Sequence, residues 1–191
     1  FNPVDPNIFW TTCQQAGCLY RTTRSANGHG LNVSYRGFSV SGDTRKRFLP
    51  PLVIDRSTPA TMYYGTYRLW RTLTEGSPGS WTPVTGALSK GSGYINTIAV
   101  APGDSRVIWV GTSDGNVQRS NDLGATFALV SLGLPNRTVT DIAVDPADAN
   151  RAVVTFSGSG TPHVYLTTDQ GATWTNISSN LPDLPFNAAA S

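Results

Sequence analysis

The chain has 191 residues, of which 39% are hydrophobic and only 14% are charged, and its formal net charge is +2. This length and hydrophobic content are sufficient for a buried core, whereas the small positive charge argues against binding to nucleic acid or to an anionic membrane. No run of 18 apolar residues occurs, so the sequence predicts no membrane-spanning segment. The 19 glycines and 13 prolines are typical of many short strands joined by tight turns.

Two cysteines, Cys13 and Cys18, lie in a segment that reads as strand, glycine-containing turn and strand over residues 9–21. Side chains that face each other in such a hairpin come within bonding distance, so we predict a Cys13–Cys18 disulfide, with two free thiols as the alternative. A single C-x4-C pair without a nearby histidine cannot supply the four ligands of a structural zinc site, and we predict no metal. The disulfide indicates an oxidising compartment, so the protein is expected to be secreted, periplasmic or at the cell surface.

Beyond residue 49 the sequence consists of units with a similar pattern. Apolar runs at 52–54, 95–100 and 139–144 each precede a turn and a second run rich in β-branched and aromatic residues. Equivalent residues of the first two runs, Val53 and Ala99, are 46 positions apart. A regular spacing of this kind predicts an array of identical supersecondary units.

The third unit shows the pattern most clearly, with four β-rich runs at about 95–100, 106–112, 116–120 and 126–132. The first run is almost entirely apolar, as expected of an innermost strand that is buried on both faces. No segment has helical periodicity over ten residues. Four strands in a unit of about 45 residues are the signature of a β-propeller blade. The sequence therefore predicts an all-β fold, a β-propeller of four-stranded antiparallel blades.

The repeat divides the chain, as a single propeller module, into blades at about 1–48, 49–92, 93–137 and 138–185. The tail 186–191 aligns, 47 positions later, with the first strand of the fourth blade, and we predict that it is the first strand of a next or closing blade. Two arrangements agree with this alignment: a closed four-bladed propeller, or part of a larger one. Because four blades is the lower limit for the fold, we favour the larger propeller.

An eight-residue motif occurs twice, 47 residues apart, and both copies share a hydroxyl residue, Asp, Gly, Thr and an aromatic residue in register. The Asp side chain can accept backbone N–H groups across a turn, Gly allows a positive φ, and the Thr hydroxyl can close the loop. The aromatic side chain is then placed to fill the gap between sheets. The shared residues are Ser120, Asp122, Gly124, Thr126 and Phe127 in the first copy, and Thr167, Asp169, Gly171, Thr173 and Trp174 in the second.

This octet resembles the Asp-box (BNR) motif, S/T-x-D-x-G-x-T-W/F, found in propellers of sialidases, xyloglucan-type glycoside hydrolases, sortilin-like receptors and photosystem assembly factors. The second blade keeps only the final aromatic residue, Trp81, and the first blade has no such motif, so the resemblance is restricted to 120–127 and 167–174. It implies that the turns lie on the rim of a propeller, away from an active site. We therefore assign Asp122 and Asp169 a structural role rather than a catalytic or metal-binding one.

Two polar residues, Asn96 and Asp141, lie near the start of innermost strands, at positions that we interpret as equivalent and facing the central channel. They are candidates for ligand contact, and the alternative is a pair of capped strand ends with ordered water. A glycosidase needs two carboxylates about 5–10 Å apart, and no carboxylate pair departs from the repeat. We therefore predict no catalytic residue and no cofactor.

These features favour a non-catalytic, extracytoplasmic binding or scaffolding module, which would meet a protein partner through its loops or exposed blade edges. The alternative is an enzyme, a fragment of a xyloglucanase- or sialidase-like propeller glycoside hydrolase, for which the ligand would be a carbohydrate. A third interpretation is an assembly factor for a membrane complex.

Overall fold

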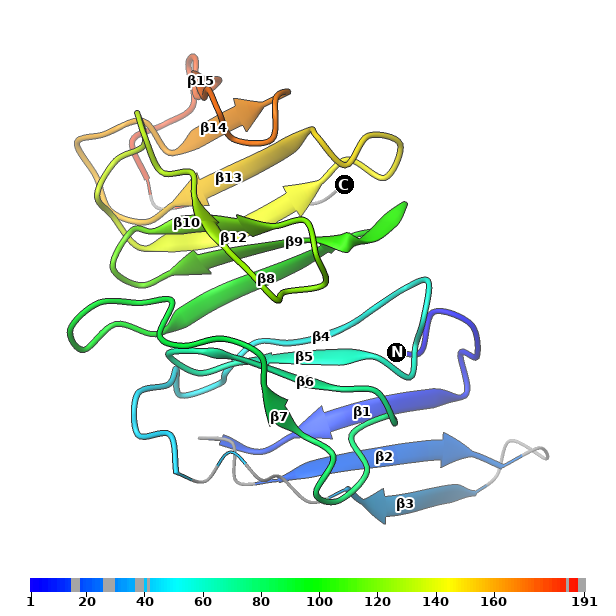
Figure 1. The fold of residues 1–191 in the computed structure, drawn as a ribbon. Coiled ribbons are helices and arrows are strands. Elements are labelled where there is room, and N and C mark those ends of the chain that lie inside the picture. Colours follow the sequence, from blue (N-terminus) through cyan, green and yellow to red (C-terminus); the bar gives the residue numbers. More distant parts are fainter. Residues whose placement is uncertain (15–17, 26–29, 37–39, 41, 185, 189–191) are drawn as a thin grey trace.

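The computed structural model describes the whole chain except residues 15–17, 26–29, 37–39, 41, 185 and 189–191. Its described residues form four antiparallel sheets and no α-helix, so none of them forms a helix that could cross a membrane. The sheets are stacked in chain order, from the N-terminal sheet at the bottom of Figure 1 to the C-terminal sheet at the top. This arrangement confirms the predicted all-β fold of about four blades.

Blade 1 contains three strands, β1 (Ile8–Thr12), β2 (Leu19–Arg24) and β3 (Leu31–Tyr35), in that spatial order. The predicted disulfide between Cys13 and Cys18 is confirmed; it joins the ends of β1 and β2 with a Cα–Cα distance of 5.1 Å. Val4, Asp5 and Pro6 match Val144, Asp145 and Pro146, which follow the first strand of blade 4, so β1 corresponds to the second strand of the other blades.

Blades 2, 3 and 4 each have four strands in sequence order, with the first strand of each blade at one edge of its sheet. Blade 2 consists of β4 (Leu52–Ile54), β5 (Met62–Gly65), β6 (Leu69–Thr72) and β7 (Thr82–Pro83). Blade 3 consists of β8 (Ile95–Ala101), β9 (Asp104–Thr112), β10 (Val117–Ser120) and β11 (Ala128–Leu129). Blade 4 consists of β12 (Val139–Val144), β13 (Ala152–Phe156), β14 (Val164–Thr167) and β15 (Thr175–Asn176).

The hydrophobic core lies between successive blades, because alternate residues of each strand point to opposite faces of its sheet. The interface of blades 1 and 2 is built around Leu19, Met62 and Tyr64. Tyr63, Ile98 and Ile108 belong to the interface of blades 2 and 3, and Trp109, Val154 and Phe156 to that of blades 3 and 4. Blades 2 and 3 are therefore each covered by a neighbouring blade on both faces.

Glycines at the ends of β5 and β9 allow the next blade to begin close by. A Cβ atom added to Gly65 would lie 2.7 Å from Ile95 Cγ2, and one added to Gly111 would lie 2.7 Å from Thr97 Cγ2 and 2.8 Å from Val139 Cβ. Such distances are shorter than side chains tolerate, so only glycine fits where the following inner strand starts.

Residues 186–191 were predicted to form a strand. Residues 186–188 have no strand conformation, and residues 189–191 lie outside the described residues. A strand requires a hydrogen-bonded neighbour, and no described strand pairs with residues 186–188. The segment nevertheless touches blade 4, because the Thr140 hydroxyl donates a hydrogen bond to the Phe186 carbonyl.

Candidate functional site

The first octet forms a turn that is closed around one carboxylate. Ser120 Oγ donates to Asp122 Oδ1 (2.7 Å), and Thr126 donates twice, from its N–H to Oδ1 (2.9 Å) and from its hydroxyl to Oδ2 (2.6 Å). The Gly124 N–H donates to Ser120 Oγ (2.9 Å). Every residue that the sequence singled out in this turn, apart from the aromatic one, therefore takes part in one hydrogen-bond network.

The second octet has the same bonds at nearly the same lengths. Thr167 Oγ1 donates to Asp169 Oδ1 (2.8 Å), and Thr173 donates from its N–H to Oδ1 (2.9 Å) and from its hydroxyl to Oδ2 (2.6 Å). The Gly171 N–H donates to Thr167 Oγ1 (2.8 Å). The two turns are thus the same structure built from slightly different residues.

Both turns require backbone in the left-handed region, with φ of 87° at Gly124 and 86° at Gly171. The hydrogen bonds from Thr126, followed by that from Ser120, lower the pKa of Asp122 to about 2, and those from Thr173 lower the pKa of Asp169. A carboxyl group that stays ionised at neutral pH is a poor general acid. The bonds and the low pKa support the structural role that the sequence assigned to these two residues.

The aromatic residue of each turn packs against the preceding blade. The Trp174 ring lies 6.0 Å from the Trp109 ring in an edge-on arrangement, and Trp174 Nε1 donates to the Val130 carbonyl (2.7 Å). Phe127 packs against the cluster that contains Tyr63. These turns therefore hold neighbouring blades together.

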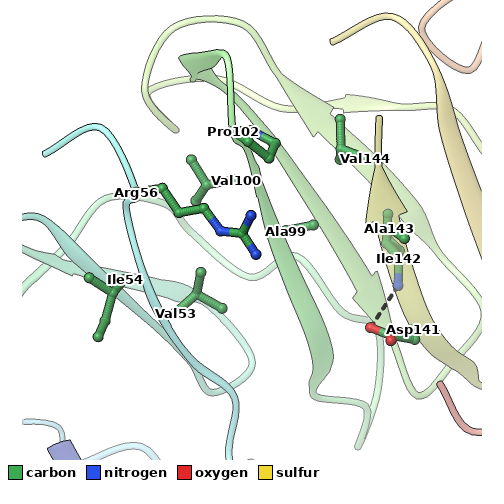
Figure 2. A pocket seen from close by; sticks show the side chains of 10 residues that line it. All are labelled: Val53, Ile54, Arg56, Ala99, Val100, Pro102, Asp141, Ile142, Ala143 and Val144. Carbon is green, nitrogen blue, oxygen red and sulfur yellow. Dashed lines mark hydrogen bonds between the residues drawn. The ribbon is translucent and has the colours of Figure 1, made fainter. Parts of the chain in front are cut away.

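The inner strands of three blades line a hollow of about 370 Å³, which we call the inner-strand hollow (Figure 2). β4, β8 and β12 each contribute, and most of the lining side chains are small and apolar. The lining residues are Val53, Ile54, Arg56, Ala99, Val100, Pro102, Asp141, Ile142, Ala143 and Val144. It is the candidate binding site on the side of the molecule where the first strands of the blades meet.

Two charged side chains lie at opposite ends of this hollow (Figure 2). Arg56 is exposed, its guanidinium group extends over the apolar lining, and among the described residues it has no hydrogen bond or ion pair. Asp141 Oδ1 accepts hydrogen bonds from Thr97 Oγ1 (3.0 Å) and from the Ile142 N–H (2.9 Å). The cation is thus available to a ligand, whereas the carboxylate is engaged in joining blades 3 and 4.

The structure does not bring the two predicted polar candidates together as an equivalent pair. Asn96 and Thr140 are the equivalent residues, because each is the extra residue of a bulge at the start of its strand, in β8 and in β12. Asn96 is buried, and its Nδ2 donates to the Val139 carbonyl of the next blade (2.7 Å). The pairing of Asn96 with Asp141 was wrong by one position, because Ile98 and Ile142 are 44 positions apart and the same offset places Thr140 opposite Asn96.

A buried carboxylate that the sequence did not single out joins the segment before β4 to blade 2. Asp43 accepts hydrogen bonds from Arg68 Nη2 (2.7 Å), Thr66 Oγ1 (2.6 Å) and Trp70 Nε1 (2.8 Å). Burial raises the pKa of Asp43, but the bonds from these three side chains together outweigh burial, so the pKa is lowered from its ordinary value. Its partners lie 23 to 27 positions along the chain, and no local pattern marks them.

The chemistry available in the inner-strand hollow is limited by its single carboxylate. Hydrolysis of a glycosidic bond requires two carboxyl groups about 5–10 Å apart, and Asp141 is the one acidic residue among those that line the hollow. No group of three or more His, Cys, Asp or Glu residues able to hold a metal ion occurs in the described part of the chain. The lining of this hollow therefore contains one of the two carboxyl groups that a glycosidase requires.

The stacked antiparallel blades, with the first strands of blades 2, 3 and 4 on one side, define a β-propeller fold. No protein-family model matches the chain. Among curated proteins it resembles a xyloglucanase of Hypocrea jecorina, with 27% identity over 157 residues. The aligned region covers 69% of this chain and only 18% of that enzyme.

Solved structures of propeller proteins resemble the chain in fold. The GH74 xyloglucanase of Xanthomonas campestris superimposes with a TM-score of 0.66 and 18% identity, covering 96% of this chain and 30% of that one. YCF48 from Cyanidioschyzon merolae gives a TM-score of 0.61 and 19% identity, covering 96% and 56% respectively. At such identities the likeness establishes the fold alone, and it confirms the predicted propeller.

Proposed function

We propose that the chain is a non-catalytic binding or scaffolding module of an extracytoplasmic propeller protein, with a protein partner that contacts the inner-strand hollow. The observation that carries this proposal is the lining of that hollow, where one carboxylate is engaged by Thr97 and Ile142 and one arginine, Arg56, is free of partners among the described residues. An apolar surface with a single cation suits an apolar peptide segment that carries a carboxylate.

Two further features support this proposal. The hollow contains no Trp, Tyr or Phe among its lining residues, so it offers no aromatic face on which a sugar ring would pack. The Cys13–Cys18 disulfide supports maturation in an oxidising compartment, because such bonds are rare in the reducing cytosol.

A second candidate function is favoured by the xyloglucanase match, which is a similarity in sequence as well as in fold. Under this alternative the chain is a segment of a xyloglucan-hydrolysing propeller. Since the match spans 18% of the enzyme, the second carboxylate of the active site would come from outside the region of similarity.

Binding of xyloglucan to the purified chain, measured by calorimetry, separates the two functions, and released reducing ends are measured alongside because hydrolysis under the alternative needs a carboxylate from outside the region of similarity. We expect neither hydrolysis nor binding. Hydrolysis that is lost in Asp141→Asn, with an unchanged unfolding midpoint, would overturn the proposal in favour of an enzyme. Binding without hydrolysis would identify a carbohydrate rather than a protein as the ligand.

A further inference from the structure

Arginines occupy equivalent positions in three of the blades. Each pairs across its sheet with an aromatic residue of the neighbouring strand: Arg21 with Trp10, Arg71 with Tyr63, and Arg119 with Trp109. In blades 1 and 3 the guanidinium group lies over the tryptophan ring, at 6.0 Å and 5.4 Å from the ring centre. The cations therefore lie on the face of each sheet that packs against the next blade.

The arginines of blades 1 and 3 bond equivalent residues of the blade that follows. Arg21 Nε forms an ion pair with Glu75 Oε2 of blade 2 (2.9 Å), and Arg119 Nη1 donates to Gln170 Oε1 of blade 4 (2.9 Å). Glu75 and Gln170 are equivalent because each directly precedes a turn glycine and has a positive φ, of 54° and 68°. The same position thus carries an anion beside Arg21 and a neutral amide beside Arg119.

Arg119 is a buried cation without a counter-ion. It is 7% exposed, and among the described residues its guanidinium group has one hydrogen bond, to Gln170, and no ion pair. Its Nε is buried and has no acceptor. Gln170 is held in place as a neutral acceptor, because its Nε2 donates to Asn150 Oδ1. Burial lowers the pKa of Arg119 from its ordinary value, since the charged form is less well solvated here than in water.

Asp104 does not supply the missing negative charge. It attracts Arg119 and acts to raise the pKa of that residue, but the effect is too weak to offset burial. Both of its oxygens accept bonds from Arg106, Oδ1 from Nε (2.9 Å) and Oδ2 from Nη2 (2.7 Å). Asp104 is therefore already paired with one cation, and the charge of Arg119 stays uncompensated.

Arg119 lines a polar hollow of about 330 Å³ between blades 3 and 4, which we call the arginine hollow. Its charged and amide-bearing lining residues are Asp104, Arg106, Arg119, Asn121, Asn150 and Gln170. Two arginines and one aspartate leave it with a net positive charge. The Asn121 side chain is exposed and has no hydrogen bond to a described residue, so its amide is available to a ligand. The arginine hollow and the inner-strand hollow share no lining residue.

We propose that the arginine hollow binds a single carboxylate on a small polar molecule, with Arg119 as the cation and Asn121 as a neutral donor. Guanidinium and carboxylate groups are complementary in charge and in their planar shape. One negative charge balances the net charge of the hollow, whereas a phosphate dianion would exceed it. The amide groups of the lining can bond the hydroxyl or amide groups that surround the carboxylate. The ligand thereby takes the place that Glu75 has beside Arg21.

The first test uses sodium glucuronate and N-acetylglycine as probes, one a sugar acid and the other a peptide carboxylate, with glucose as the neutral control. In NMR titrations of the isotope-labelled chain, the side-chain signals of Arg119 and Asn121 should shift saturably with at least one of the two carboxylates and not with glucose. The probe that binds more tightly identifies the source of the carboxylate. No saturable shift with either carboxylate, or an equal shift with glucose, would overturn the proposal.

Gln170→Glu provides the sharpest variant, because the new carboxylate would pair with Arg119 as in the equivalent pair between blades 1 and 2. We expect it to weaken binding of the same probe by about tenfold or more, with no fall in the urea midpoint of unfolding. Asn136→Asp is the matched control, since it is also a change from amide to carboxylate. Asn136 is exposed and lies beside Gly115, beyond the opposite end of β9, so the affinity should change by less than about twofold.

A second variant keeps the test valid if Gln170→Glu does not fold. Asn121→Ala removes an exposed side chain that bonds no described residue, so the fold should be unaffected. Loss of its one hydrogen bond to the ligand should weaken binding about threefold. If Gln170→Glu and Asn121→Ala both bind the probe as tightly as the parent does, the carboxylate lies elsewhere and the proposal is wrong.

Discussion

Replacement of Asp43 by Asn removes one charge from a buried network and leaves the shape of the side chain unchanged. The Asp43 carboxylate accepts bonds on both oxygens, with Arg68 Nη2 on Oδ1 and with Arg68 Nε, Thr66 Oγ1 and Trp70 Nε1 on Oδ2. An Asn side chain has one acceptor oxygen and presents an NH₂ group to donors at the other position. The variant therefore leaves at least one buried donor without an acceptor and Arg68 without its counter-ion.

The expected loss follows from the burial of the pair. Breaking a buried ion pair by removal of one partner costs about 3–5 kcal/mol. Water reaches the Arg68 side chain, which is 28% exposed, and will compensate part of this loss. We therefore expect Asp43→Asn to lower the free energy of unfolding by about 2–3 kcal/mol, below the range for a fully buried pair.

Urea unfolding near neutral pH, followed by tryptophan fluorescence and circular dichroism, measures this loss. Asp104→Asn is the matched control, because Asp104 and Arg106 form a pair at the same 2.7 Å distance but Arg106 is 70% exposed. The midpoint of this control should be unchanged. Coincident transitions by the two probes are required before the midpoints are converted to free energies.

The pH dependence provides a second test of the same reasoning. The folded protein lowers the pKa of Asp43, so its stabilising effect is fully present above the ordinary value of 3.8 and is lost as the pH falls through the lower, folded-state pKa. The difference between wild type and Asp43→Asn should accordingly shrink in acid. A loss at neutral pH no larger than that of Asp104→Asn, or a difference that persists in acid, would refute the reasoning.

Three further predictions concern the turns, the blade interfaces and the disulfide. Gly111→Ala should destabilise the protein by about 1–3 kcal/mol through overpacking against Val139, whereas Gly86→Ala, with open space around it, should have little effect in the same urea assay. Because the pKa of Asp122 is lowered to about 2, an acid titration should show that its contribution to stability is lost between about pH 4 and pH 2, and Asp122→Asn should abolish this dependence. Reduction of the disulfide opens the loop between Cys13 and Cys18, so the unfolded state gains entropy and the thermal midpoint should fall by the equivalent of about 2 kcal/mol. The comparison is between the oxidised protein and a sample that has been reduced and alkylated.

Local features of the sequence determined the blade pattern. Alternating and continuous apolar runs specify strands, Gly and Asp specify the turns between them, and both act over a few residues, so they can be read without knowledge of the fold. The recurrence of the octet at 120–127 and 167–174 then placed the third and fourth strands of two blades, and Cys13 and Cys18 were close enough in the chain for their pairing to be inferred.

Only the tertiary structure decided which residues meet across blades. The bulges at Asn96 and Thr140 depend on strand register, which is set by packing against neighbouring sheets. The Asp43 network joins residues more than 20 positions apart, and the inner-strand hollow is lined by residues from three blades. The repeat is a property of the local sequence, whereas the binding surfaces arise from contacts between residues that no local pattern connects.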